Sequence, residues 1–160
     1  PKGGAGKTTL STNVAGYFAS QGHAVMLGDV DRQQSSRLWL GLRPAEARPI
    51  TNWDVSRDNI VKPPKGTTHV VLDTPGGLHG SRFKEVVKLA DKVLVPLQPS
   101  IFDIYATQAF LDKLREHRQL LDQDLGRRTH GVFGVVAAGG VGQQGVEMRG
   151  QHVEQVGFVR

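Results

Sequence analysis

The start of the chain carries a short glycine-rich loop that leads directly into a helix-like segment. Residues 2–9 read Lys-Gly-Gly-Ala-Gly-Lys-Thr-Thr. Three glycines within four residues let the backbone adopt positive φ and turn its N–H groups inward, which makes a concave site for anionic oxygens. The start of the following helix adds a dipole that favours negative charge. The loop therefore predicts a phosphate site, and such a site requires a strand before the loop and a helix after it.

The side chains after the glycines are those that a nucleotide site uses. We expect Lys7 to reach the β- and γ-phosphates, the Thr8 hydroxyl to ligate Mg²⁺, and Thr9 to touch the α-phosphate. The general phosphate-loop pattern begins with Gly where this chain has Pro1, but the run from residue 2 to residue 8 is intact. The predicted phosphate-binding residues are Gly3, Gly4, Ala5, Gly6, Lys7, Thr8 and Thr9.

Apolar runs alternate with segments of helical period along the rest of the chain. Ser35 or Ser36, Ser81 and Asp103 are each placed to cap a helix. Strands that alternate with helices predict an α/β fold of the P-loop NTPase type, in which helices cover both faces of a mostly parallel sheet. We expect helices at residues 7–21, 35–40, 53–60, 81–90 and 103–125, and strands at residues 24–29, 69–73, 93–97 and 131–138.

Length and composition fit one domain. The 160 residues suit a single P-loop domain spanning residues 1–160, and 38% hydrophobic residues are typical of a globular chain. No strand precedes the loop and no finishing element follows residue 157, so we expect truncation at the N-terminus and at the C-terminus. The chain has no Cys, which excludes disulfides and thiolate metal sites. Its net charge of +5 is compatible with a polyanionic partner.

Carboxylates follow two of the predicted strands. Asp73 ends the apolar run at residues 69–73, so we expect its carboxylate at the carboxyl edge of the sheet, where it would hold Mg²⁺ through a water ligand. The alternative is an acid that merely caps the next turn. Asp29 and Asp31 are spaced by two, which puts both on one side of an extended segment.

Four segments together resemble the ParA/MinD family of deviant Walker A P-loop ATPases, and most closely its short plasmid-type ParA proteins. They are the loop at residues 2–9, D-V-D-R-Q at residues 29–33, V-V-L-D-T-P at residues 70–75, and P-L-Q-P-S at residues 96–100. The family has Pro where this chain has Arg32. The resemblance covers residues 2–125.

The resemblance implies a mechanism and a set of partners. In this family the residue equivalent to Lys2 crosses a dimer interface to the partner's nucleotide, and the equivalent of Asp31 positions the attacking water; Asp29 is then a structural carboxylate. The implied cofactors are ATP and Mg²⁺, with weak intrinsic turnover. The implied partners are a second copy when ATP is bound, non-specific DNA, and a ParB-type protein, in the cytoplasm at the nucleoid. The candidate DNA-binding cations are Arg82, Lys84, Lys88, Lys92, Arg115, Arg118, Arg127 and Arg128.

Two other functions fit the same sequence. One is an ATP-dependent small-molecule synthetase of the same P-loop clan, of the dethiobiotin or cobyrinate type, which activates a carboxylate. The other is a binding module that holds nucleotide without hydrolysing it. The six His residues show no metal-ligand spacing, and no apolar run approaches the ~20 residues that span a bilayer, so we expect neither zinc nor a membrane partner.

Overall fold

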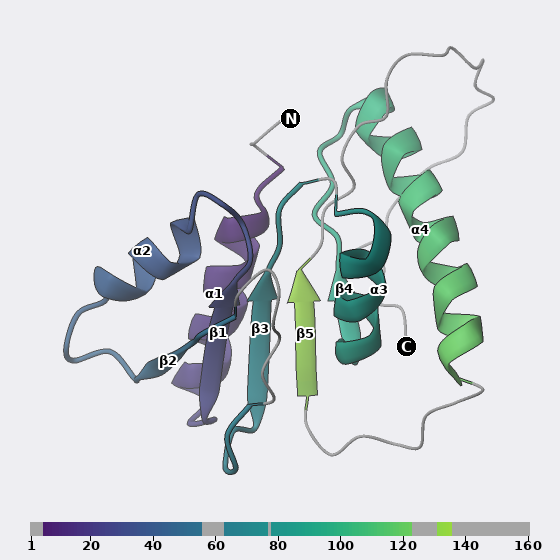
Figure 1. The fold of residues 1–160 in the computed structure, drawn as a ribbon. Coiled ribbons are helices and arrows are strands. Elements are labelled where there is room, and N and C mark those ends of the chain that lie inside the picture. Colours follow the sequence, from purple (N-terminus) through teal and green to yellow (C-terminus); the bar gives the residue numbers. More distant parts are fainter. Residues whose placement is uncertain (1–4, 56–62, 77, 123–130, 136–160) are drawn as a thin grey trace.

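A computed structural model describes residues 5–55, 63–76, 78–122 and 131–135 of the chain. Helices and strands alternate through most of this range, as predicted (Figure 1). In chain order the elements are α1 (Lys7–Ser20), β1 (Val25–Asp29), α2 (Ser35–Gly41), β2 (Ile50–Trp53), β3 (His69–Asp73), α3 (Gly80–Leu89), β4 (Lys92–Leu94), α4 (Ile101–Asp122) and β5 (Gly131–Val135).

The strands form one sheet in the order β2-β1-β3-β5-β4, and every neighbouring pair is parallel. β1 and β3 pair along their whole lengths, from Val25 opposite His69 to Asp29 opposite Asp73. β5 lies between β3 and β4 (Figure 1). Because all strands run the same way, their carboxyl ends share one edge of the sheet. The predicted parallel α/β fold is confirmed.

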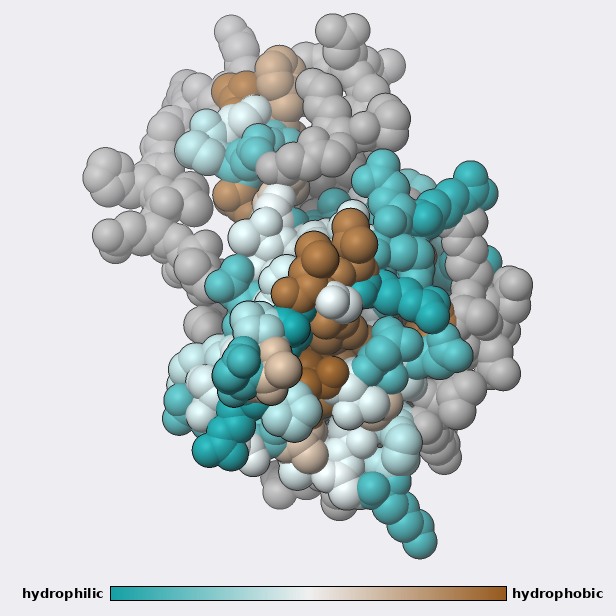
Figure 2. Space-filling view, turned by 90° about the vertical axis from the view of Figure 1, so that its left-hand side faces the viewer, coloured by the Kyte–Doolittle hydropathy of each residue, from teal (hydrophilic) through white to brown (hydrophobic). Residues whose placement is uncertain are grey.

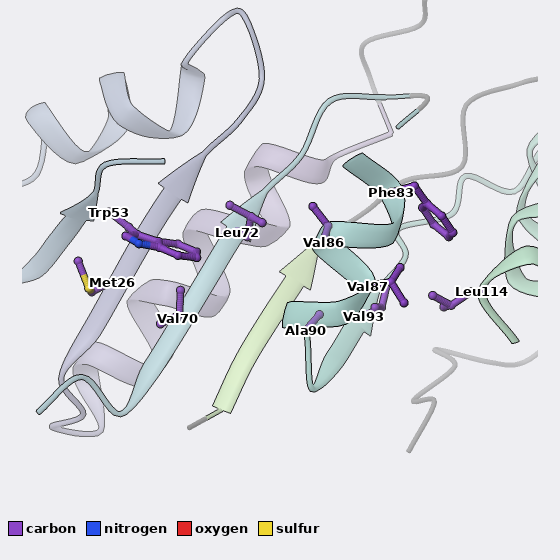
Figure 3. Close-up of a cluster of buried hydrophobic side chains, with 10 residues drawn as sticks. All are labelled: Met26, Trp53, Val70, Leu72, Phe83, Val86, Val87, Ala90, Val93 and Leu114. Carbon is purple, nitrogen blue, oxygen red and sulfur yellow. The ribbon is translucent and has the colours of Figure 1, made fainter. Parts of the chain in front are cut away.

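Helices cover both faces of the sheet, because side chains alternate between faces along each strand. On one face, Val25, Leu27 and Val71 pack against Ala15 and Ala19 of α1. Met26, Val70 and Leu72 alternate with these residues and face the opposite way. They belong to a second cluster that includes side chains from α3 and α4 (Figure 3). Its buried members are Met26, Trp53, Val70, Leu72, Phe83, Val86, Val87, Ala90, Val93 and Leu114.

The edge strand β2 was not predicted, and the helix expected at residues 53–60 is wrong at its start. Trp53 ends β2 and is only 4% exposed, and residues 56–62 of the expected helix lie outside the described residues. The indole packs over Gly28 of β1, where an added Cβ would lie 2.9 Å from the Trp53 Cε3 atom and 2.8 Å from the Val55 Cγ2 atom. Only a residue without a side chain leaves room for this contact.

Most predicted boundaries agree with the structure, while the predicted caps do not. The strand at residues 69–73 is confirmed at both ends, and α1 ends one residue earlier than predicted. Ser81 lies inside α3, whose N-cap residue is His79, and Asp103 lies in the first turn of α4. The fourth predicted strand, at residues 131–138, begins at Gly131 as expected, and its last three residues are outside the described part.

The side of the molecule that carries α2 and β2 has a band of hydrophobic side chains flanked by polar ones (Figure 2). Within α2 and directly after it, Leu38 is 67% exposed and Leu42 is 73% exposed. Among the described residues, no helix is both long and apolar enough to cross a bilayer.

Candidate nucleotide site

The first turn of α1 presents a helix N-terminus that no described side chain caps. Its N-cap residue is Gly6, with φ of 81°, in the left-handed region that favours glycine. The first helical bond runs from the Leu10 N–H to the Gly6 carbonyl at 2.8 Å. The N–H groups of the first helical residues point away from the helix and are suited to bind anions. Lys2, Gly3 and Gly4 of the predicted loop lie outside the described residues, whereas Ala5 and Gly6 lie within them.

Lys7 lies beside the turn that follows β3. Its Nζ atom is 3.5 Å from the position that a Cβ on Gly76 would occupy. Gly76 comes three residues after Asp73, so the lysine from the first helix and the acid from β3 belong to the same corner of the molecule. A Cβ at residue 76 would therefore lie in ordinary van der Waals contact with the ammonium group.

The threonines predicted to bind nucleotide occupy the same turn of α1. Thr8 is half-buried and Thr9 is exposed. The Thr12 hydroxyl donates to the Thr8 carbonyl at 2.9 Å and to the Thr9 carbonyl at 3.1 Å, and the Ser11 hydroxyl donates to the Lys7 carbonyl at 3.0 Å. In these bonds, hydroxyls of the second turn of α1 donate to the backbone carbonyls of its first turn. Within the described ranges, no side chain caps the outward-facing N–H groups of this turn.

Asp73 ends β3 as a buried carboxylate with one oxygen unpaired. The residue is 1% exposed, and its Oδ2 atom accepts a short hydrogen bond from the hydroxyl of Ser36, which is fully buried. Its Oδ1 atom has no hydrogen-bond partner among the described residues. Leaving a buried carboxylate oxygen unpaired costs about 1–3 kcal/mol or more, so this oxygen is suited to accept a hydrogen bond. A Mg²⁺-bound water would satisfy this oxygen, and Thr8 on α1 offers the hydroxyl that such a metal uses.

Asp29, at the end of β1, caps α2 from outside the helix. Its Oδ1 atom accepts from the Asp31 N–H at 2.9 Å, and its Oδ2 atom accepts from the Ser36 N–H at 2.9 Å and the Arg37 N–H at 3.4 Å. The predicted cap by Ser35 or Ser36 is wrong, because both serines lie inside α2 and its N-cap residue is Gln34. The carboxylate therefore ties together both ends of the loop at residues 30–34.

The electrostatic surroundings of Asp29 oppose its ionisation. Burial raises the pKa of this carboxyl above its usual value, and the negative charge of Asp73 raises it further. The hydrogen bonds donated by the backbone of Asp31, Ser36 and Arg37 lower the pKa and partly offset the increase. Two acids at one sheet edge thus create a local excess of negative charge. A cation bound there would reduce that excess.

Asp31 lies in the loop between β1 and α2, two residues beyond the strand. Its Oδ1 atom accepts from the Gln33 N–H at 3.1 Å, and its backbone carbonyl accepts from the Gln34 side chain at 2.8 Å. Gln34 also donates to the Asp29 carbonyl at 2.8 Å and has a left-handed φ of 51°. No described residue donates to the second carboxylate oxygen of Asp31. Hydrogen bonds within the loop at residues 30–34 thus hold Asp31 in place, and they leave its second carboxylate oxygen able to accept a further hydrogen bond.

The predicted site residues that are described gather at one corner of the fold. Lys7 and Thr8 begin α1, Asp73 ends β3, and Asp31 follows β1, so all four lie towards the carboxyl edge of the parallel sheet (Figure 1). Ser36 was missed as a part of this corner. It was expected only as a helix cap, and no local pattern indicates that its hydroxyl would reach an acid 37 residues away.

Comparisons with known proteins identify a family and several relatives of this chain. Residues 1–151 match the family described as the CobQ/CobB/MinD/ParA nucleotide binding domain. A maintenance of carboxysome distribution protein A from Halothiobacillus neapolitanus is 28% identical over 74% of this chain and 56% of its own length. A protein with the same name from Gloeobacter kilaueensis is 30% identical over 75% of this chain and 58% of its own. Protein ParA from Rhizobium radiobacter is 26% identical over 78% of this chain and 57% of its own.

The chain therefore spans a little over half of the length of each of these relatives. The family match extends over nearly the whole chain and includes the phosphate loop, the loop after β1 and the end of β3. The expectation drawn from the motifs is confirmed: the chain belongs to the CobQ/CobB/MinD/ParA family of nucleotide-binding domains.

Proposed function

We propose that the protein is a Mg²⁺-dependent ATPase of the partition type. In this proposal it dimerises when ATP is bound, coats DNA without sequence preference, and is released after hydrolysis stimulated by a ParB-type partner. The observation that carries the proposal is the meeting of an uncapped helix N-terminus, Lys7 and the unpaired oxygen of Asp73 at one edge of the sheet. The family match and the relative named ParA support the same reading.

Nucleotide binding would use the first turn of α1. The N–H groups after Gly6 would bind phosphate oxygens, and the Lys7 ammonium would neutralise the charge on the β- and γ-phosphates. Because Lys7 lies beside Gly76, a bound phosphate would lie between α1 and the turn after β3. Gly3, Gly4, Ala5 and Thr9 complete the proposed phosphate site.

The fit to Mg²⁺ rests on two groups. The buried Oδ1 atom of Asp73 would accept a hydrogen bond from a water on the metal, and the Thr8 hydroxyl would be a direct ligand. When bound, Mg²⁺ would neutralise negative charge that develops on the phosphates. Among the described residues, no cluster of three or more acids and histidines forms a metal site of its own. The phosphates would accordingly supply the remaining negative ligands.

For hydrolysis we assign the attacking water to Asp31. Its unpaired carboxylate oxygen would accept a hydrogen bond from that water and orient it. The hydrogen bonds from Gln33 and Gln34 to the loop would hold the carboxylate in place while the water attacks. Lys2 would act from the second copy, with its ammonium on the partner's nucleotide. A monomer would then bind ATP and hydrolyse it slowly, if at all.

DNA binding would use cations away from the nucleotide. Lys84 and Lys88 are exposed and one turn apart on α3, and the exposed Lys92 begins β4. Arg115 is a weaker candidate because it pairs with Asp112 at 3.1 Å. Two of the relatives have names that refer to carboxysome distribution. That wording supports a role in moving a cargo, and we propose plasmid or chromosomal DNA as the cargo and the nucleoid as the location.

The test is ATP turnover by the purified protein with and without non-specific duplex DNA, beside the variants Lys2→Ala and Lys113→Ala. Weak turnover that DNA stimulates and that Lys2→Ala abolishes is the expected result, because dimerisation would place Lys2 on the partner's nucleotide. The exposed Lys113 controls for the loss of one positive charge and should leave turnover unchanged. If neither the addition of DNA nor the Lys2→Ala substitution changes the rate of ATP turnover, the partition mechanism is contradicted.

A further inference from the structure

Ser36 joins the two acids at the carboxyl edge of the sheet. Its N–H donates to Oδ2 of Asp29 at 2.9 Å, and its hydroxyl donates to Oδ2 of Asp73. Ser36 is fully buried, and the two acids are only 5% and 1% exposed. The serine is therefore held at its backbone by one strand and bonded at its side chain to another. Its neighbour Ser35 is only half-buried, and its side chain bonds to neither acid.

The hydroxyl of Ser36 makes the two oxygens of Asp73 unequal. One oxygen is occupied by the serine, and the other is buried with no partner in the part of the chain that the structure describes. A carboxylate that is free to rotate would exchange these oxygens, whereas a donor fixed on one side selects a single orientation. Groups that orient a metal-binding residue in this way change metal affinity about 10–100-fold when they are removed.

We propose that Ser36 is a positioning residue that orients Asp73, so that the unpaired oxygen is presented to the water shell of nucleotide-bound Mg²⁺. This inference rests on the proposed nucleotide site and adds a residue to it. Because Asp29 holds the Ser36 N–H, the orientation of Asp73 also depends on the packing of the first turn of α2. The loop that carries Asp31 is anchored to the same Asp29 carboxylate. The positions of Asp31 and Asp73 therefore both depend on Asp29.

The experiment measures binding of a fluorescent ADP analogue while Mg²⁺ is titrated, and again in EDTA. Wild type, Ser36→Ala and the matched control Ser35→Ala are compared, together with the melting temperature of each protein without nucleotide. We expect Ser36→Ala to raise the Mg²⁺ concentration for half-maximal enhancement about tenfold. Its affinity in EDTA should stay at the wild-type value, and Ser35→Ala should match wild type in both conditions.

Each alternative result has one meaning. If Ser36→Ala needs no more Mg²⁺ than wild type, or loses affinity equally with and without Mg²⁺, Ser36 is only a structural residue and the inference is overturned. If wild type itself shows no Mg²⁺-enhanced nucleotide binding, the proposed function fails, and this inference fails with it. If Ser36→Ala does not fold, Ser36→Cys is used instead, because its thiol occupies the same position and is a weaker hydrogen-bond donor. A higher Mg²⁺ requirement of Ser36→Cys than of wild type would support the inference, and an unchanged requirement would overturn it.

Discussion

Asp29 and Asp73 are register partners at the carboxyl ends of β1 and β3, and Ser36 donates a hydrogen bond to each of them. Parallel pairing thus places two acids from distant parts of the sequence side by side. The two acids differ in their hydrogen-bond partners. Asp29 accepts three backbone N–H groups and organises a loop, whereas one oxygen of Asp73 has no partner among the residues that the structure describes.

Replacing Asp29 by Ala should destabilise the fold. The change leaves the N–H groups of Asp31 and Ser36 without their acceptor, which we expect to cost about 1–3 kcal/mol of the free energy of unfolding. Urea unfolding followed by circular dichroism measures the loss. Asp54→Ala removes an exposed acid as the control and should have little effect. Equal stability of the two variants would show that Asp29 is not the cap of α2.

Asp31→Ala should separate hydrolysis from binding. Removing the proposed water-orienting carboxylate should slow single-turnover ATP hydrolysis about 10²-fold or more, while the nucleotide dissociation constant stays close to wild type. The two quantities are measured by quench-flow and by equilibrium fluorescence. Hydrolysis at the wild-type rate would remove Asp31 from the mechanism. A parallel loss of affinity would instead indicate that the residue supports the loop.

Gly28→Ala should destabilise the sheet through crowding. A Cβ there would come within 2.8 Å of Val55 and 2.9 Å of Trp53, so the indole must shift, at a cost of about 1–3 kcal/mol. Gly16→Ala is the matched control, because a Cβ on this α1 glycine has nothing within 4 Å. Alanine is also the better helix former, so the control should be neutral or stabilising. Thermal melting of both variants makes the comparison.

Stability should fall as the pH drops through the titration range of His69. The His69 ring lies 4.2 Å from each of the Phe18 and His23 ring centroids, and burial, followed by the charge of His23, lowers its pKa. The unfolded chain therefore binds this proton first, so the contribution of His69 is complete above about pH 6.5 and is lost as the pH falls through the lowered value.

His69→Phe keeps an aromatic ring and removes the titrating group. It should flatten the plot of unfolding free energy against pH between pH 7.5 and pH 5, because the group with the lowered pKa is gone. If unfolding free energy changes with pH as steeply in His69→Phe as in wild type, groups other than His69 cause the pH dependence.

The sequence was sufficient to predict the parallel architecture and the sheet edge at which the described candidate residues gather. The strand at residues 69–73 has an apolar run ending in an acid, and α1 follows a glycine-rich loop, so both could be placed from local pattern alone. β2 escaped prediction because Thr51 and Asn52 are exposed, Ile50 is half-buried, and only Trp53 is buried. Such a strand is defined by pairing with β1 and by Gly28 beneath the indole, and neither is a local property.

The hydrogen bonds of the candidate site could not be predicted from the local sequence pattern, for a similar reason. Serines before an apolar segment are good N-caps in general, so Ser35 and Ser36 were expected to act locally. In the structure the acid of β1 takes that role, which leaves the Ser36 hydroxyl for Asp73. Which group caps a helix depends here on the register of β1 against β3, and that is set by the whole sheet.

The most direct test of the central claim is the affinity for ATP in the presence of Mg²⁺, measured for wild type, Lys7→Ala and the exposed control Lys113→Ala. A phosphate site at the start of α1 predicts saturable binding by wild type and by the control, and a loss of about 100-fold or more for Lys7→Ala, because a buried charge-assisted contact is worth roughly 3 kcal/mol. Equal affinity of Lys7→Ala and wild type would contradict the assignment of the nucleotide site.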